Sequence, residues 1–230
     1  MFRRFLVLAV LLAGCTAQEG APPPSSSAPP PSSSAVPVPD QWNQMGRRAQ
    51  SAYVAKEAFG TDAKWEEDQP SGPGGYEHGT PEVSEVCGDV KIGSGFKVTR
   101  SRWWRGEYVV LGQVVHALSE QKASELLDQI WAKSRTCPTY APTDGLAARA
   151  VSSDAAVASP EGLDGFYAFC ETAPDIGDGS DICMAYLARG DLLVSLRSNT
   201  LSSDPLVSRH EAMQQLQKAT PLAAKALAAA

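Results

Sequence analysis

The first 40 residues constrain the fold most, because their composition leaves only the remainder of the chain to form a core. Arg3 and Arg4 precede an apolar run at 5–12, which ends in Leu12-Ala13-Gly14-Cys15. A basic start, a short apolar stretch and small residues before a cleavage site are typical of a secretory signal. A cysteine directly after Leu and two small residues is typical of a bacterial lipobox. We interpret residues 1–14 as a lipoprotein signal peptide and Cys15 as the lipid-attachment residue.

A plain secretory signal cleaved near Ala13 is the alternative interpretation. A permanent transmembrane helix is disfavoured, because the apolar run is far shorter than the roughly 20 residues that span a bilayer. Two acyl chains give stable membrane anchoring, whereas one chain alone is marginal. We therefore expect a protein at the cell membrane, anchored by acyl chains on the N-terminal cysteine and exposed on the extracytoplasmic face.

A tether follows the cysteine over residues 15–40. It nearly repeats the unit Pro-Pro-Pro-Ser-Ser-Ser-Ala, a composition that cannot bury a core and stays extended. We interpret it as a disordered spacer and residues 41–230 as a single extracytoplasmic domain, which is long enough to bury its own core.

The charge balance excludes one class of partner. The chain has 20 Lys and Arg against 26 Asp and Glu, a formal net charge of −6. Removing residues 1–14, which hold two arginines and no acidic residue, takes it to −8. An acidic chain without a basic stripe is a poor nucleic-acid binder, so we expect none, and it lacks a polybasic patch for anionic lipid. Composition and charge leave the oligomeric state open.

Cysteine usage agrees with export. The domain holds an even set of four cysteines, which suggests two disulfides in an oxidising compartment: Cys87, Cys137, Cys170 and Cys183. Of the three connectivities, we favour Cys87–Cys137 with Cys170–Cys183, because Cys170 and Cys183 flank one turn-rich segment between two expected strands. A four-cysteine zinc site is the alternative, but no pair has Cys-x2-Cys spacing. We expect no metal and no cofactor.

Hydrophobic periodicity predicts a mixed fold. Helical spacing appears at 40–58, at 119–137 and from Asp204-Pro205 onward, whereas alternating or apolar runs predict strands at 96–104, 108–118, 147–151, 165–171, 182–188 and 192–197. A long loop is expected at 61–81. Helices separated from neighbouring antiparallel strands predict an α+β fold, with an antiparallel sheet, helices packed on one face and two disulfides.

The helix at 119–137 has the clearest pattern. Ser119 is its expected N-cap, and an apolar stripe follows at helical spacing: Ala123, Leu126, Leu127, Ile130 and Trp131. A helix with one such stripe must lie on a sheet or on another helix.

Several of these segments together resemble a known family. They are the Gln113-Val114-Val115 strand, the helix bearing Trp131 and ending at Cys137, Cys183-x-Ala185, and the run at 189–194 before an alanine-rich C-terminal helix. Over residues 85–229 the chain resembles the PknH-like extracellular sensor domain, found on some actinobacterial Ser/Thr kinases and on standalone lipoproteins. The resemblance implies an α+β fold held by two disulfides, with a cleft that receives an unknown ligand.

Catalytic patterns are weak. The three histidines are His78 in a loop, His116 in an apolar strand and His210 on a polar helix face, and no serine lies in Gly-x-Ser-x-Gly. Aspartates at 175, 178 and 181 lie around glycines and suggest a calcium loop, although a solvated hairpin tip explains them better. We therefore predict a protein that is not an enzyme. A cell-envelope hydrolase acting on wall or lipid substrates is the alternative.

Aromatic residues supply the binding hypothesis. Trp103 and Trp104 are adjacent on a strand and must point to opposite faces, so one can enter the core while the other stays accessible. Together with Trp65 and Tyr76 in the 61–81 segment, they form the expected ligand-binding set. We predict a non-enzymatic cleft beside the 119–137 helix, closed by the 61–81 loop, for a small envelope ligand or a protein partner.

Overall fold

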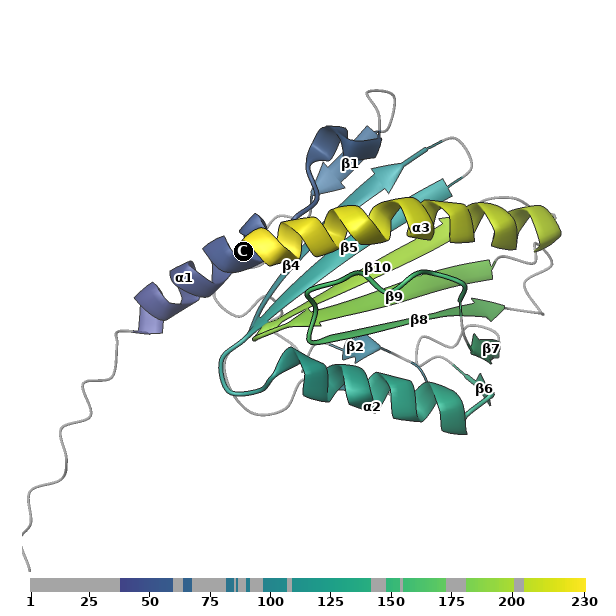
Figure 1. Ribbon diagram of the computed structural model, residues 1–230, viewed down its shortest axis with the longest axis horizontal. Coiled ribbons are helices and arrows are strands. Elements are labelled where there is room, and N and C mark those ends of the chain that lie inside the picture. Colours follow the sequence, from purple (N-terminus) through teal and green to yellow (C-terminus); the bar gives the residue numbers. More distant parts are fainter. Residues whose placement is uncertain are drawn as a thin grey trace, which may run out of the picture. The chain divides into compact units, whose positions relative to one another are not determined.

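Eight antiparallel strands form one twisted sheet at the centre of the described chain (Figure 1). The computed structural model describes residues 38–59, 64–67, 82–84, 86, 90–91, 97–106, 109–141, 148–153, 155–172, 181–200 and 205–230. The predicted signal peptide, Cys15 and nearly all of the predicted tether lie outside these residues. The region 36–230 forms one compact unit.

The elements follow the expected order with several differences in their bounds. The helices are α1 (Val38–Ser51), the short 3-10 helix η1 (Lys56–Phe59), α2 (Ala123–Thr136) and α3 (Pro205–Ala229). The strands are β1 (Lys64–Glu67), β2 (Glu82–Ser84), β3 (Val90–Lys91), β4 (Lys97–Arg105), β5 (Val109–Leu118), β6 (Thr139–Tyr140), β7 (Arg149–Ser153), β8 (Gly165–Thr172), β9 (Asp181–Arg189) and β10 (Leu192–Thr200).

The sheet has the order β1-β4-β5-β10-β9-β8-β7-β6, and β2 and β3 pair separately. Each neighbouring pair is antiparallel, which confirms the α+β class and the antiparallel sheet. The expected 61–81 loop contains β1, whose backbone pairs with β4 and extends the sheet at that edge. The other residues of 61–81 lie outside the described part, so closure of the cleft by this loop stays a prediction.

Helices cover both faces of the sheet, whereas the sequence pattern predicted one face. One core joins α1 and α3 to the side of the sheet that carries Ala185, Leu187 and Val194. A second core joins α2 to the other side, through Tyr186 and Leu193. Residues of the two cores alternate along β9 and along the first residues of β10, so both faces of the sheet need a cover there.

Helix α2 begins later than predicted. Its N-cap is Lys122, which makes no side-chain cap, because strand β5 continues to Leu118 and the link to the helix is held by Ala123 N–H donating to Gly190 O at 3.0 Å. Four stripe residues are buried as expected, but Trp131 is 50% exposed. The Arg135 guanidinium lies 5.7 Å from the centre of that ring, so Trp131 belongs to the surface.

The first helix ends before its predicted limit. The 40–58 pattern predicted one helix, but α1 ends at Ser51 and the chain turns at Ala52 and Tyr53 before η1 begins. Two buried polar side chains of the sheet hold the break. Gln113 donates to Ala52 O at 2.9 Å and accepts from Val54 N at 3.0 Å, and Arg102 donates to Val54 O at 2.8 Å. These contacts replace helical hydrogen bonds, which makes the break stable.

One predicted disulfide is present as predicted. Cys170 and Cys183 face each other across β8 and β9, with their Cα atoms 4.0 Å apart. Cys137 is also disulfide-bonded. Its predicted partner, Cys87, lies outside the described residues, so the Cys87–Cys137 pairing stays a prediction.

Helix α3 continues through Pro221, although a proline inside a helix removes one backbone hydrogen-bond donor. Residues on both sides of the proline are buried in the same core, including Leu216 and Leu227, and this packing compensates for the missing backbone donor. None of the helices among the described residues has the length and apolarity needed to cross a membrane.

Candidate functional site

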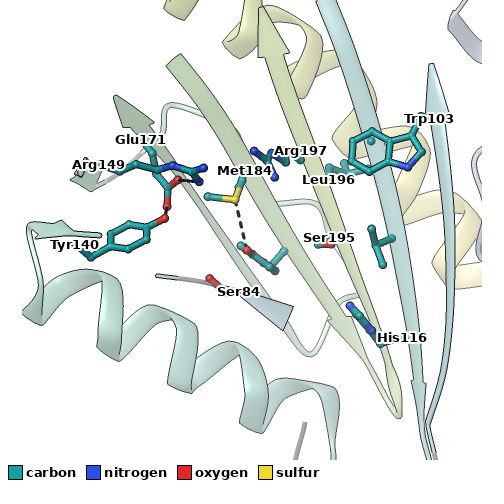
Figure 2. A pocket seen from close by; sticks show the side chains of 13 residues that line it. Ser84, Trp103, His116, Tyr140, Arg149, Glu171, Met184, Ser195, Leu196 and Arg197 are labelled. Atoms are coloured by element: carbon teal, nitrogen blue, oxygen red, sulfur yellow. Dashed lines mark hydrogen bonds and ion pairs between the residues drawn. The ribbon is translucent and has the colours of Figure 1, made fainter. Parts of the chain in front are cut away.

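A cavity of about 220 Å³ lies on the sheet face that carries α2. Its wall comes from seven strands of the main sheet and from Ser84 of β2 (Figure 2). The lining residues are Ser84, Trp103, Gly112, Val114, His116, Tyr140, Arg149, Glu171, Met184, Tyr186, Ser195, Leu196 and Arg197. Helix α2 packs on Tyr167, Phe169 and Tyr186 beside it, so the helix covers one part of this face and the cavity occupies another.

The alternation of β10 explains why a cavity forms here. Leu192, Val194 and Leu196 are buried in the core beneath α3. On the opposite face Leu193 gives way to Ser195 and then to Arg197, both only partly buried. An apolar face and a polar face along one strand predict a dry core on one side and a wet surface on the other.

Trp103 forms one side wall of the cavity. It lies opposite Gly112 in the β4–β5 register, and its ring lies where a side chain of residue 112 would stand. A Cβ built on Gly112 would be 2.3 Å from Trp103 Cζ3. A glycine inside a strand often marks such a close approach. The absence of a side chain at position 112 therefore lets the indole lie against the sheet, with part of its surface facing the cavity.

A buried polar cluster forms the opposite wall, where the side chains of Tyr140, Arg149 and Glu171 meet (Figure 2). The Tyr140 hydroxyl donates to Glu171 Oε1 at 2.5 Å, and Arg149 Nη1 donates to Glu171 Oε2 at 3.3 Å. The Glu171 residue is only 1% exposed. Both carboxylate oxygens are thus bonded within the protein, which fixes the geometry of this wall.

Burial shapes the electrostatics of the cluster. It raises the pKa of Glu171 above its ordinary value, against the opposing effects of the Tyr140 hydrogen bond and of the Arg149 and Arg197 charges. The pKa of Tyr140 is also raised, by burial first and by the neighbouring carboxylate second. The phenol therefore stays a hydrogen-bond donor throughout the physiological range.

The floor between the two walls carries Arg197. In the strand register Arg197 lies between Gly112 of β5 and Met184 of β9. Figure 2 shows it between Met184 and Trp103. Farther along the floor, His116 is buried and its Nδ1 lies 3.0 Å from the Thr99 hydroxyl.

The structure separates the predicted ligand-binding residues. Trp103 lines the cavity, whereas Trp104 is 2% exposed on the opposite face, where its Nε1 donates to Lys56 O at 3.1 Å and its ring meets Phe59. Trp65 lies opposite Trp104 in the backbone register of β1 and β4, and its side chain and all of Tyr76 fall outside the described part.

Of the other candidates, His210 is exposed and bonds Gln214. Asp181 accepts from the Thr172 hydroxyl at 2.5 Å. His78, Asp175 and Asp178 lie outside the described residues. Among the residues that the structure describes, no group of three or more His, Cys, Asp or Glu side chains could hold a metal ion.

Sequence reasoning missed four residues of this site: Tyr140, Arg149, Glu171 and Arg197. The strand pattern contained two usable signals. A glycine interrupts the Val-rich strand β5 opposite a tryptophan, and a polar face alternates with an apolar one along β10. The Tyr140–Arg149–Glu171 cluster had no local signal, because it joins three strands from separate parts of the sequence.

The comparisons with known proteins leave the class of this chain open. No protein-family model matches it, and no curated protein matches it at a significant level. The functional reading therefore depends on the fold and on the cavity.

Proposed function

We propose that this protein is a membrane-anchored bacterial lipoprotein whose extracytoplasmic domain binds a small ligand in the Trp103 cavity. The lipobox at residues 12–15 supports the anchoring. The resemblance to PknH-like sensor domains supports a binding or sensing role. The geometry of the described residues bears on ligand binding, and the support for that part of the proposal follows.

The observation that carries the proposal is the contrast between the two walls of the cavity. Trp103 offers an aromatic surface on one side, and a fixed polar cluster around Glu171 lies on the other. Ligand pockets commonly combine apolar or aromatic walls with a few placed polar groups that fix orientation. This cavity has that composition, at a size suited to a small molecule.

The envelope hydrolase remains the competing function, and Glu171 is its best candidate acid or base because burial raises its pKa. The geometry favours binding over catalysis. A general acid or base must reach the reacting atom of a substrate, whereas Glu171 is almost fully buried and both its oxygens bond Tyr140 and Arg149.

A thermal-shift screen of the full chain against wall fragments and short-chain lipids tests the proposal. A ligand that binds only the folded state raises the unfolding midpoint. We expect such ligands to stabilise the wild type and the Trp131→Ala control, whose altered side chain lies on the surface of α2, but not Trp103→Ala. Equal stabilisation of both variants would contradict binding in this cavity. Ester hydrolysis that is lost in Glu171→Gln would establish the hydrolase instead.

A further inference from the structure

The floor of the cavity carries Arg197, whose guanidinium has two terminal nitrogens available to bind a ligand. Arg197 Nε donates to Asn199 Oδ1 at 3.2 Å, which orients the guanidinium. Within the described part of the chain, its Nη1 and Nη2 have no hydrogen-bond or ion-pair partner. The charge of Arg197 acts on the Glu171 carboxylate and helps to lower its pKa, but the hydrogen bonds of that carboxylate come from Tyr140 and Arg149. A planar fork of N–H donors is therefore left to face the cavity.

The charges of the lining residues leave an excess of positive charge. Arg149 forms an ion pair with Glu171, with Arg149 Nη1 3.3 Å from Glu171 Oε2. The positive charge of Arg197 is in excess of that pair. With His116 counted as neutral, the described lining residues carry one net positive charge when Glu171 is ionised and two when it is protonated. This occurs in a chain with a net charge of −6. A cleft lined by positive charge concentrates anions locally, even in a protein whose overall charge is negative.

The aromatic wall lies next to this charge. Trp103, Gly112, Arg197 and Met184 follow one another in a single row across β4, β5, β10 and β9. Gly112 adds no side chain between the indole and the guanidinium. A flat ring lying on Trp103 would therefore place an attached acidic group in the direction of the arginine fork (Figure 2).

We propose that the cavity binds a small aromatic carboxylate, with its ring on Trp103 and its carboxylate held by the Nη atoms of Arg197. This inference rests on the proposed ligand-binding function and names its ligand class. A carboxylate matches the guanidinium fork in shape, and a monoanion matches the single excess charge. A volume of about 220 Å³ favours one ring with a short acid arm.

Calorimetric titration of the full chain tests the class of ligand. The probes are 3-phenylpropanoate, its neutral amide 3-phenylpropanamide, the non-aromatic 3-cyclohexylpropanoate, and phenyl phosphate. We expect 3-phenylpropanoate to bind at least tenfold more tightly than each of the other three. Equal affinity for 3-phenylpropanoate and its amide would show that the cavity does not recognise the negative charge. Tighter binding of phenyl phosphate than of 3-phenylpropanoate would show that the preferred ligand is not a carboxylate.

Two pairs of variants locate the ligand. Arg197→Gln should weaken binding of 3-phenylpropanoate about tenfold or more, since a charge-assisted hydrogen bond of roughly 1.5–3 kcal/mol is lost. Arg189→Gln, at the exposed end of β9, should leave the affinity unchanged. Gly112→Ala should weaken binding by displacing the indole, and Gly106→Ala, where a Cβ meets nothing closer than 3.5 Å, should not. Equal affinities within either pair would overturn the proposal.

The proposed function and this inference fail in different ways. Binding of the neutral amide that is lost in Gly112→Ala but kept in Arg197→Gln would reject the carboxylate and retain the ligand-binding cavity. Absence of binding for all four probes at 10 mM, a concentration on the order of the weakest measurable small-ligand affinity, would reject the aromatic carboxylate. The thermal-shift screen decides the wider function separately. The unfolding midpoint of each variant checks that it is folded.

Discussion

Gln113 shows how one residue can determine where a helix ends. It is fully buried in β5, and its amide bonds both Ala52 O and Val54 N. Arg102 supports the same turn, with its guanidinium 4.3 Å from the centre of the Tyr53 ring. The chain leaving α1 is thereby attached to the sheet by polar contacts. Buried polar groups are costly unless they are bonded, so these contacts specify one path for the chain.

Replacing Gln113 with Leu should lower the free energy of unfolding by about 3 kcal/mol, because a buried donor and a buried acceptor each lose a partner at roughly 1–3 kcal/mol. Gln50→Leu, on the exposed side of α1, is the control and should change it by about 0.5 kcal/mol or less. Urea unfolding followed by circular dichroism measures both. Equal values for the two variants would show that the amide does not hold the turn.

Glu171 should make the stability depend on pH in a defined direction. Because burial raises its pKa in the folded state, the folded protein binds the proton more tightly than the unfolded chain. The contribution is fully present below the ordinary pKa of 4.5 and is lost as the pH rises through the raised value. Relative to Glu171→Gln, the wild type should therefore lose stability as the pH increases above about 4.5.

Urea midpoints of the wild type and of Glu171→Gln between pH 4 and pH 7 measure this difference. Subtracting the two curves removes the contribution of the other titrating groups that both proteins share. A difference that is flat, or that grows in favour of the wild type with rising pH, would contradict the assignment.

At the scale of elements, the sequence pattern was sufficient for the main strands and for the buried stripe of α2. Alternating apolar residues are a local signal, so β4, β5, β8, β9 and β10 could be predicted within a few residues. Helix ends were less predictable. The end of α1 depends on Gln113 and the start of α2 on Gly190, and both partners are far away in the sequence. Trp131 had helical spacing but lies beyond the edge of the covered surface.

The placement of helices on two faces also depends on tertiary structure. Strand β9 is apolar at most positions, which indicates a strand buried on both sides, whereas β10 is apolar on both faces only at its start and turns polar on one face from Ser195 on. The site was only partly predictable for the same reason. Trp103 was identified from its position beside Trp104, whereas the cluster of Glu171 with its two partners requires the strand order of the sheet.

Because Cys170 pairs with Cys183, Cys137 must form its disulfide with another cysteine, and we predict that this is Cys87. If Cys137 pairs with Cys87, peptide mapping under non-reducing conditions should give two linked peptides, one for each pair. Cys15 should appear in neither if its sulfur carries lipid, as we propose. A peptide that joins Cys137 to any cysteine other than Cys87 would overturn the predicted connectivity.

At the scale of the whole molecule, we propose that the N-terminal segment anchors the domain to the membrane through Cys15. Cys15→Ala should release the protein from membranes or leave the precursor uncleaved, because the acceptor for the acyl chains is gone. Membrane fractionation with mass spectrometry of the N-terminal peptide measures this outcome. Acyl chains still present on the variant would contradict lipid attachment at Cys15. Residues 36–230 should fold equally well in the variant, as judged by its unfolding midpoint.

The central claim is that ligand occupies the Trp103 face of the sheet and not the core beneath α3. Methyl NMR of the full chain with ¹³C-labelled methionine tests it most directly. Met184 lines the cavity, whereas Met45 and Met213 lie in the core on the opposite face. On titration with 3-phenylpropanoate, the account predicts a saturable shift of the Met184 methyl signal, with those of Met45 and Met213 unmoved. A shift at Met45 or Met213 with Met184 unmoved would contradict it.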